Sequence, residues 1–285
     1  MNLDLHYDYT AVGHVTIDVL ADGARQPGGS AFYSAVQAAR LGRRTLILTR
    51  GRAGEIELLL EPYARELDLR VLPAAHTTTL ATAGRGAERR QRVLAWAGPM
   101  PEDLALDTAI LHLAPVARET PGAWRGRVAF VGLTPQGLAR AWSQGGEMGP
   151  ARPSERAAAV AARCDAIVMS RHERASCAEL ILAATRCGAR IAITAAADPT
   201  LLIAPGGDEL EVDVPALEAP GEDLGAGDVF AAAFFIALGD GLAAAHAARF
   251  ANAAAAVRMR GAGARAIGAR EEIEARLHAT GGTGE

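Results

Sequence analysis

The stretch that most constrains the fold is an apolar run from Val229 to Leu238, which would leave a helix without any polar face. A helix that is hydrophobic all round has to be buried, so the rest of the chain must surround it. Gly225 and Gly227 precede this run where the first helical turn is expected, although glycine costs about 1 kcal/mol relative to alanine inside a helix. We therefore expect the two glycines to serve a site at the N-terminus of a buried helix.

This helix start has the features of an anion site. First-turn N–H groups have no partner within a helix, the helix dipole is positive there, and glycine lets a ligand approach the backbone. Asp228 follows directly, and a carboxylate beside an anion suits a general base that accepts a proton from an attacking hydroxyl. The alternative is that Asp228 is only an acidic first-turn residue favoured by the dipole.

The basic residues exclude several kinds of chemistry. All 29 of them are arginines, so the chain contains no lysine. A Walker A loop and the nucleotide-binding lysine of protein kinases are thereby ruled out, as is Schiff-base chemistry with pyridoxal phosphate. Any phosphate chemistry has to use backbone amides, arginine and metal.

The net charge and the composition limit the kinds of molecule that the protein is expected to bind. A net charge of -4 gives no general basic face for nucleic acid, and no stretch of 18 apolar residues could span a membrane. The three cysteines lack CxxC spacing and are expected to be free thiols in a reducing compartment. We expect a cytoplasmic protein, a monomer or homodimer, whose partner is a small molecule rather than nucleic acid or membrane.

The hydrophobic pattern alternates between strands and helices, which favours a parallel sheet with helices on both faces. Strands are expected at 11–20, 45–49, 69–72, 109–113, 128–131, 166–169 and 191–194, with a hairpin at 201–203 and 210–212. Helices are expected at 30–41, 55–66, 134–142, 154–163, 173–187 and 242–258. The turn-rich segment 18–28 and the polar hairpin 77–97 form a small β excursion, whose arginines either are a solvated edge or face an acidic ligand.

Two motifs together resemble a known family. Gly28-Gly29-Ser30-Ala31, leading to Leu41-Gly42, resembles the N-terminal signature of the ribokinase-like (PfkB) carbohydrate kinases, and Gly225-Ala226-Gly227-Asp228 resembles their C-terminal one. The resemblance covers nearly the whole chain, and residues 107–113 and 128–139 look most like the myo-inositol kinase branch. It implies one three-layer αβα domain over residues 1–285, with a central mostly parallel sheet and a small β lid from 18–28 and 77–97.

The resemblance also implies an activity, which is phosphorylation of a sugar or polyol hydroxyl with ATP and Mg²⁺. The implied roles are Asp228 as catalytic base; the amides of Gly225, Ala226 and Gly227 as anion hole; Asp18, Gly28, Gly29 and Tyr33 at the substrate; Glu173 at the magnesium and its waters; and Thr194, Ala196 and Asn252 at the nucleotide. For Glu173 and Asn252, a dipole-favoured acid and a packing amide remain the alternatives.

The chain departs from the family pattern around this site. Tyr33 replaces the usual Asn, Ser170 begins the NxxE motif, and the TxGxxG nucleotide loop reads Thr194-Ala195-Ala196-Ala197-Asp198-Pro199. Alanine and proline are poor substitutes where a loop needs positive φ or close approach of backbone to phosphate. The alternatives to a sugar or polyol kinase are therefore a catalytically weak relative that acts as a sensor or scaffold, and a nucleoside kinase.

Overall fold

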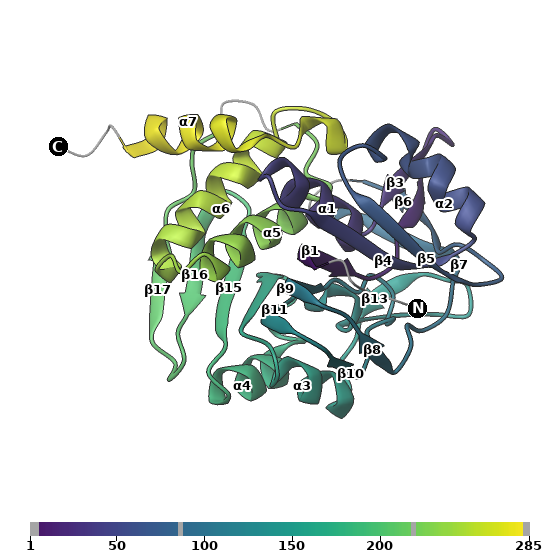
Figure 1. Ribbon diagram of the computed structural model, residues 1–285, viewed down its shortest axis with the longest axis horizontal. Helices are drawn as coiled ribbons and strands as arrows, with labels where there is room; N and C mark the ends of the chain where they lie inside the picture. The colour runs from purple at the N-terminus through teal and green to yellow at the C-terminus, as the bar shows by residue number, and fades with distance from the viewer. Residues whose placement is uncertain (1–5, 85–87, 218–220, 282–285) are drawn as a thin grey trace.

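Nine strands form one central sheet in the computed structural model, which describes residues 6–84, 88–217 and 221–281 (Figure 1). In spatial order they are β17 (Glu209–Val212), β16 (Asp198–Ile203), β15 (Arg190–Ala195), β14 (Ala166–Ser170), β11 (Val128–Leu133), β9 (Thr108–Leu113), β1 (Tyr7–Val12), β4 (Thr45–Gly51) and β5 (Asp68–Pro73). Neighbours from β15 to β5 pair in parallel, whereas β16 and β17 are antiparallel. The predicted mostly parallel sheet and its terminal hairpin are confirmed.

Helices cover both faces of this sheet (Figure 1). One layer contains α1 (Ser30–Arg40), α2 (Ala53–Leu60), α5 (Ala226–Gly239) and α6 (Ala244–Arg258), with α7 (Arg270–Gly281) packed on α6; the other contains α3 (Glu155–Ala161) and α4 (Ala178–Arg186). Every residue of α5 from Val229 to Ala237 is buried, as its all-apolar surface requires. The predicted three-layer ribokinase-like αβα fold is thereby confirmed.

A second sheet lies beside the central one and joins two separated segments. Its order is β3 (Arg25–Gly28), β2 (Thr16–Val19), β6 (Thr79–Ala83) and β7 (Arg90–Ala95). These strands fall in the two expected lid segments, although the hairpin turn at 85–87 lies outside the described residues. We call these four strands the small sheet; its closure over a ligand stays a prediction.

The single strand expected at 11–20 was wrong. The chain leaves the central sheet after Val12 and enters the small sheet at Thr16. Gly13 lies at the change of direction, and a Cβ there would be 2.1 Å from the carbonyl oxygen of Ala114. The close passage of these two backbones therefore requires glycine at the point where one apolar run divides into two strands.

Three predicted helices were also wrong, one in its type and two in their limits. Residues 134–142 form only the short 3₁₀ helix η3 (Pro135–Gly137), followed by β12 (Arg140–Trp142), which pairs with β13 (Met148–Pro150). The helix predicted at 173–187 begins at Ala178, and residues 171–177 form turns. The helix predicted at 55–66 ends at Leu60 and continues as the 3₁₀ turn η1 (Glu61–Tyr63), where Pro62 removes a backbone donor. Another short pair, β8 (Asp103–Ala105) with β10 (Ala123–Arg125), was not predicted.

Candidate active site at the N-terminus of helix α5

Glycine is present at positions 225 and 227, before the apolar run, for different physical reasons. Gly225 is the N-cap of α5 with φ 82°, and a Cβ on it would lie 2.3 Å from the Tyr33 ring. Both its left-handed conformation and its packing on Tyr33 thus require glycine. A Cβ on Gly227 would instead meet nothing within 4 Å. Gly227 alone fits the expectation of a glycine kept bare for an approaching ligand.

The first-turn amides are not equally available. The Ala226 N–H donates to the Asp223 carbonyl oxygen at 3.1 Å, which closes the turn into the helix. Within the described ranges, the N–H groups of Gly225 and Gly227 have no acceptor in the protein. The candidate anion hole therefore offers these two donors at the positive end of the α5 dipole, with Ala226 already engaged.

Asp228 lies in the same turn and is held by α1. The Ser30 hydroxyl donates to its Oδ1 at 2.5 Å, and the Ser34 hydroxyl donates to its backbone carbonyl at 3.2 Å. Burial, together with the neighbouring Glu173 carboxylate, raises the pKa of Asp228 from 3.8 to about 6, and the Ser30 hydrogen bond and the charges of Arg140 and Arg89 partly oppose this rise. A carboxylate with this pKa is poised to exchange a proton near neutral pH.

Glu173 lies in the turn after β14 and faces the same region. Its Oε2 accepts hydrogen bonds from the Ser170 N–H and the Ser170 hydroxyl, both at 2.9 Å. Its Oε1 is buried without a hydrogen-bond partner. A carboxylate oxygen left unsatisfied beside a phosphate site fits Mg²⁺, which keeps several waters and uses one or two carboxylates besides the phosphates. Among the described residues, no cluster of three or more His, Cys, Asp or Glu side chains could hold a metal ion without such additional ligands.

Arg140 is a site residue that sequence reasoning missed, because its segment was predicted as a helix. Strand β12 brings it beside β7, where it donates to Gln91 Oε1 at 3.0 Å. Its charge acts on both Asp228 and Glu173, and burial lowers its own pKa. Among the arginines that lower the pKa of Asp228, Arg140 has the largest effect, and the chain has no lysine that could supply a positive charge instead.

Asp18 lies in β2 of the small sheet and is almost fully buried. The Thr16 hydroxyl donates to its Oδ1 at 2.7 Å, and a Cβ on Gly28 would lie 2.3 Å from its carboxylate. Burial raises the pKa of Asp18 to about 6, partly offset by the Thr16 hydrogen bond and by the charge of Arg89. Gly29, with φ 92°, is the N-cap of α1 and packs on the His14 carbonyl oxygen. The structure thus brings Asp18, Gly28 and Gly29 together.

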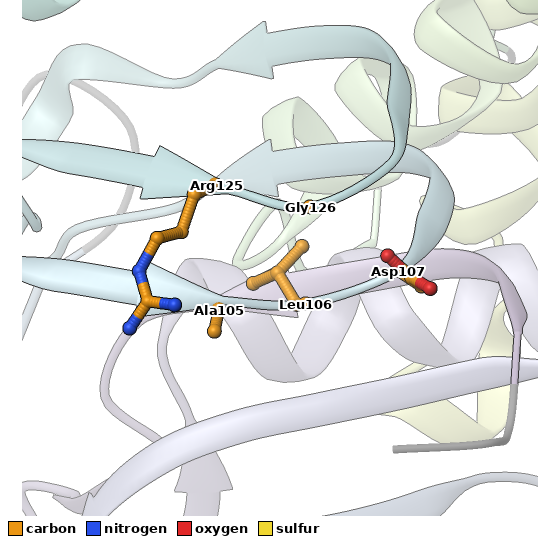
Figure 2. A pocket seen from close by; sticks show the side chains of 5 residues that line it. All are labelled: Ala105, Leu106, Asp107, Arg125 and Gly126. Carbon is orange, nitrogen blue, oxygen red and sulfur yellow. The ribbon is translucent and has the colours of Figure 1, made fainter.

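A cavity of about 710 Å³ opens next to these residues. The small sheet, Tyr33, Tyr63 and the loops before α5 and after α6 line it. Arg89, the residue before β7, forms an ion pair with Asp223, and both line this cavity; Glu222 is a further carboxylate on its wall. A separate hollow of about 240 Å³, shown in Figure 2, lies where β9 and β11 begin. Glu173 of the site follows the carboxyl end of β14, whereas this hollow lies before the amino ends of β9 and β11. The hollow is therefore at the opposite end of the parallel strands from the site.

The three residues expected at the nucleotide lie along β15, β16 and α6. The Thr194 hydroxyl donates to the Met169 carbonyl oxygen at 3.4 Å, and Ala196 has φ 56° in the exposed turn between β15 and β16. The buried Asn252 accepts from the Thr200 hydroxyl at 2.9 Å and donates to the Asp213 carbonyl oxygen at 3.0 Å. Its amide is therefore satisfied inside the protein, as the packing alternative describes.

The comparisons with known proteins bear on the family and the fold. Residues 150–270, which include Glu173, Asp228 and Asn252, match the profile described as pfkB family carbohydrate kinase. This segment, which is less than half of the chain, is thus similar to the pfkB family carbohydrate kinases. The N-terminal signature lies outside the matched range, and the comparison with curated proteins gave no match.

Solved structures with the same fold include several kinases of low sequence identity. A pyrophosphate-dependent kinase of the ribokinase family, complexed with a pyrophosphate analog and myo-inositol, is 21% identical with a TM-score of 0.75, covering 94% of this chain and 99% of that one. An Arabidopsis thaliana ribokinase complexed with ribose and ATP is 16% identical with a TM-score of 0.70, covering 96% and 99%. A Methanocaldococcus jannaschii nucleoside kinase is 16% identical with a TM-score of 0.71, covering 95% and 98%. Among the described residues, no helix has the length and apolar character needed to cross a membrane.

The different reasons for the two glycines predict opposite effects on stability. Gly225→Ala should lower the free energy of unfolding by at least about 1–2 kcal/mol, because it strains the left-handed position and overlaps Tyr33. Gly227→Ala should leave it unchanged or raise it by up to about 1 kcal/mol, because alanine favours the helix and meets no atom. Urea titrations of both variants measure this. Equal losses would show that Gly227 also has a packing role.

The raised pKa of Asp228 predicts a pH-dependent gain in stability on neutralisation. A buried acid with a raised pKa destabilises the folded state when ionised, so its cost is complete above about pH 6 and vanishes below its ordinary pKa of 3.8. Asp228→Asn should therefore raise the free energy of unfolding by about 1–3 kcal/mol at pH 8. The gain should shrink as the pH falls to 4. Thermal melts across this range test it, with the exposed Asp208→Asn as control; a gain independent of pH would contradict it.

Proposed function

We propose that this protein is a kinase that transfers a phosphoryl group from a Mg²⁺-bound donor to a hydroxyl of a sugar or polyol. The observation that carries the proposal is the half-buried Asp228 carboxylate, with a pKa of about 6, in the same helical turn as the open amides of Gly225 and Gly227. A base and an anion site side by side are what hydroxyl attack on phosphorus requires.

The residues of the chain divide the chemistry as follows. Asp228 accepts the proton of the acceptor hydroxyl as that oxygen attacks phosphorus, and Ser30 fixes the carboxylate by donating to Oδ1. The Gly225 and Gly227 amides and the Arg140 guanidinium stabilise the negative charge on the transferred group. Glu173, through its unsatisfied Oε1, holds the water shell of magnesium, which neutralises the phosphates of the donor when bound.

The cavity favours a neutral acceptor rich in hydroxyl groups. Its wall offers the carboxylates of Asp22, Glu222 and Asp223 as hydrogen-bond acceptors, with Arg89 as donor. The rings of Tyr33 and Tyr63 supply the flat apolar surfaces that suit the carbon face of a cyclic polyol. Asp18 lies next to Tyr33, whose pKa it raises, and is a further candidate for hydroxyl contact.

The resemblance implies ATP as the phosphoryl donor. Pyrophosphate is a second candidate, which the residues expected to contact the nucleotide base favour. Both ends of the Asn252 amide are engaged inside the protein, and the turn at Ala196 has neither glycine of the family loop. The diphosphate end of either donor needs only the α5 amides, Arg140 and magnesium. The kinase that is described as pyrophosphate-dependent has the same fold at a TM-score of 0.75.

The catalytic role of Asp228 predicts a loss of turnover without a loss of binding. Asp228→Asn should reduce kcat by about 10²–10⁴-fold, and native kcat/KM should fall below about pH 6 as the base becomes protonated. Phosphorylated product is measured with inositols, pentoses, hexoses and nucleosides, with Asp208→Asn as the matched control. Near-native turnover of Asp228→Asn would remove Asp228 from the mechanism. No product from the folded native protein would favour the sensor or scaffold, and product from nucleosides alone a nucleoside kinase.

The donor is tested by supplying ATP and pyrophosphate separately with the same acceptor. We expect pyrophosphate to support transfer at a lower KM than ATP, because the contacts left for the donor are to phosphate groups. Adenosine added to the pyrophosphate reaction is the control, and it should not compete. Inhibition by adenosine that is competitive with pyrophosphate, or transfer from ATP alone, would show a site for the base and return the assignment to ATP. Inhibition that is competitive with the acceptor instead would place adenosine in the acceptor site.

A further inference from the structure

Arg258 is the largest side chain without solvent exposure among the described residues, and the proposed chemistry does not use it directly. It is the last residue of α6, and its guanidinium donates to three backbone carbonyl oxygens. These belong to Leu224 at 2.5 Å, Gly261 at 3.0 Å and Glu222 at 3.3 Å. Burying a charge is costly unless it is paired and hydrogen-bonded, so this arrangement calls for a reason.

The carbonyl groups around Arg258 come from the two loops that border the proposed site. Glu222 and Leu224 belong to the segment that leads into the left-handed Gly225, and Gly261 follows α6. The Glu222 carboxylate lies 3.6 Å from the guanidinium and also accepts the Gly263 N–H at 2.7 Å. Several oxygens converging on one buried positive charge make a cation site, in which the cation is part of the chain.

The same guanidinium supports the wall of the anion hole. It lies over the Tyr33 ring, with 5.7 Å from its Cζ to the ring centroid, and that ring packs on Gly225. Arg258 therefore contacts the approach to α5 through the Leu224 carbonyl and, through Tyr33, the cap residue itself. Each contact fixes where the Gly225 amide lies.

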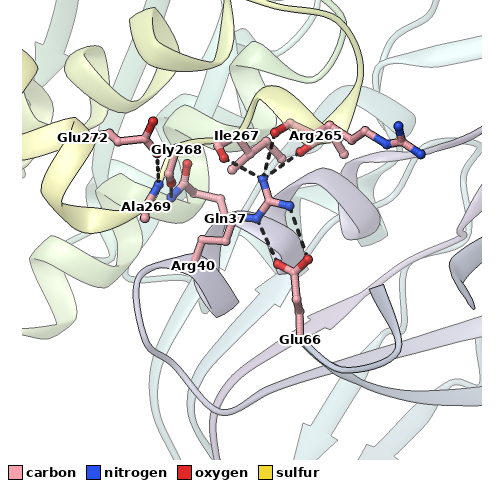
Figure 3. Close-up of polar contacts among 9 residues, drawn as sticks. Gln37, Arg40, Glu66, Arg265, Ile267, Gly268, Ala269 and Glu272 are labelled. Atoms are coloured by element: carbon pink, nitrogen blue, oxygen red, sulfur yellow. Dashed lines mark hydrogen bonds and ion pairs between the residues drawn. The ribbon is translucent and has the colours of Figure 1, made fainter. Parts of the chain in front are cut away.

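A second arginine holds the far side of the loop after α6. Arg40 of α1 donates from one nitrogen to the carbonyl oxygens of Ala264, Arg265 and Ile267, at 3.1, 3.2 and 2.6 Å (Figure 3). Its other nitrogens bind the Glu66 carboxylate. The loop is thus anchored independently of Arg258, so removal of Arg258 leaves one side of the carbonyl cage in place.

We propose that Arg258 is a built-in cation that positions the Glu222–Gly225 segment, and with it the anion hole. This deepens the proposed kinase function and rests on it for the effect on turnover. Arg258 is a positioning residue, because it acts on the reacting groups only through backbone and Tyr33. Without its guanidinium, the Glu222, Leu224 and Gly261 carbonyls and the Glu222 carboxylate would surround a space suited to a free monovalent cation such as K⁺.

The experiment compares native protein with Arg258→Met in a tetramethylammonium buffer to which KCl is added. Native turnover should not depend on K⁺, since the cation site is filled. Arg258→Met should lose kcat, by about 10²-fold for a displaced anion hole, with a smaller change in acceptor KM, and should regain turnover as K⁺ or guanidinium is added. Arg260→Met removes an exposed arginine two residues on and is the matched control.

Thermal melts separate this inference from the proposed function. K⁺ should raise the melting temperature of Arg258→Met more than tetramethylammonium does, and should not do so for the native protein or Arg260→Met. If this K⁺-dependent shift is observed but neither the native protein nor the variants turn over substrate, the built-in cation is supported and the proposed kinase function is rejected. Activation of the native protein by K⁺ would overturn the inference, as would a folded Arg258→Met that neither K⁺ nor guanidinium restores. If Arg258→Met does not fold, Arg258→Lys is the second variant: its ammonium keeps a charge in the cage but reaches fewer carbonyl groups, so turnover should fall in part and K⁺ should not restore it. Full native turnover of Arg258→Lys, or its activation by K⁺, would overturn the inference.

Discussion

The burial of helix α5 on all sides is the constraint on which the rest of the structure depends. Its middle is buried on all sides, yet in the proposed function its first turn presents two amides and the Asp228 carboxylate to a ligand. The packing of α1 and α6 on the helix satisfies the apolar part, and Ser30 from α1 supports the carboxylate. A rigid helix held on all sides fixes donor and base relative to each other, which a mobile loop would not do.

How much the sequence predicts depends on the range of the interaction involved. The sheet, its flanking helices and the buried α5 follow from apolar periodicity, which is a local property. The limits at Gly13 and near Pro135 do not, because close passage of distant backbone requires glycine there: a Cβ on Gly13 would meet Ala114, and one on Gly137 would meet Pro115. At the site, Gly225 and Gly227 look equivalent in the sequence. Their separate reasons, Tyr33 packing and open space, exist only once α1 and α5 meet.

The same limit explains why two arginines were missed. Arg140 reaches the site through a short strand pair whose partner is distant in the sequence, and Arg258 looks like an ordinary helix-ending cation. In a chain without lysine, arginine performs distinct tasks: Arg89 bridges sheet to loop, Arg40 binds three carbonyls, and Arg258 is fully buried. A planar guanidinium with five donors can contact several carbonyl groups at once, whereas a compact ammonium has three donors and loses its proton more readily when buried.

The division of one apolar run between β1 and β2 has a mechanical consequence. The chain passes between the two sheets at Gly13–Val15, after Gly28, before Thr79 and after Ala95, so it crosses between them four times. Thr78 joins three of these crossings, because its hydroxyl contacts His14 Nδ1 at 2.8 Å and accepts the Ala97 N–H at 3.0 Å. A bending motion at one crossing is thereby transmitted to the others. The small sheet should therefore move relative to the central sheet as one rigid unit, with Thr78 at the hinge between them.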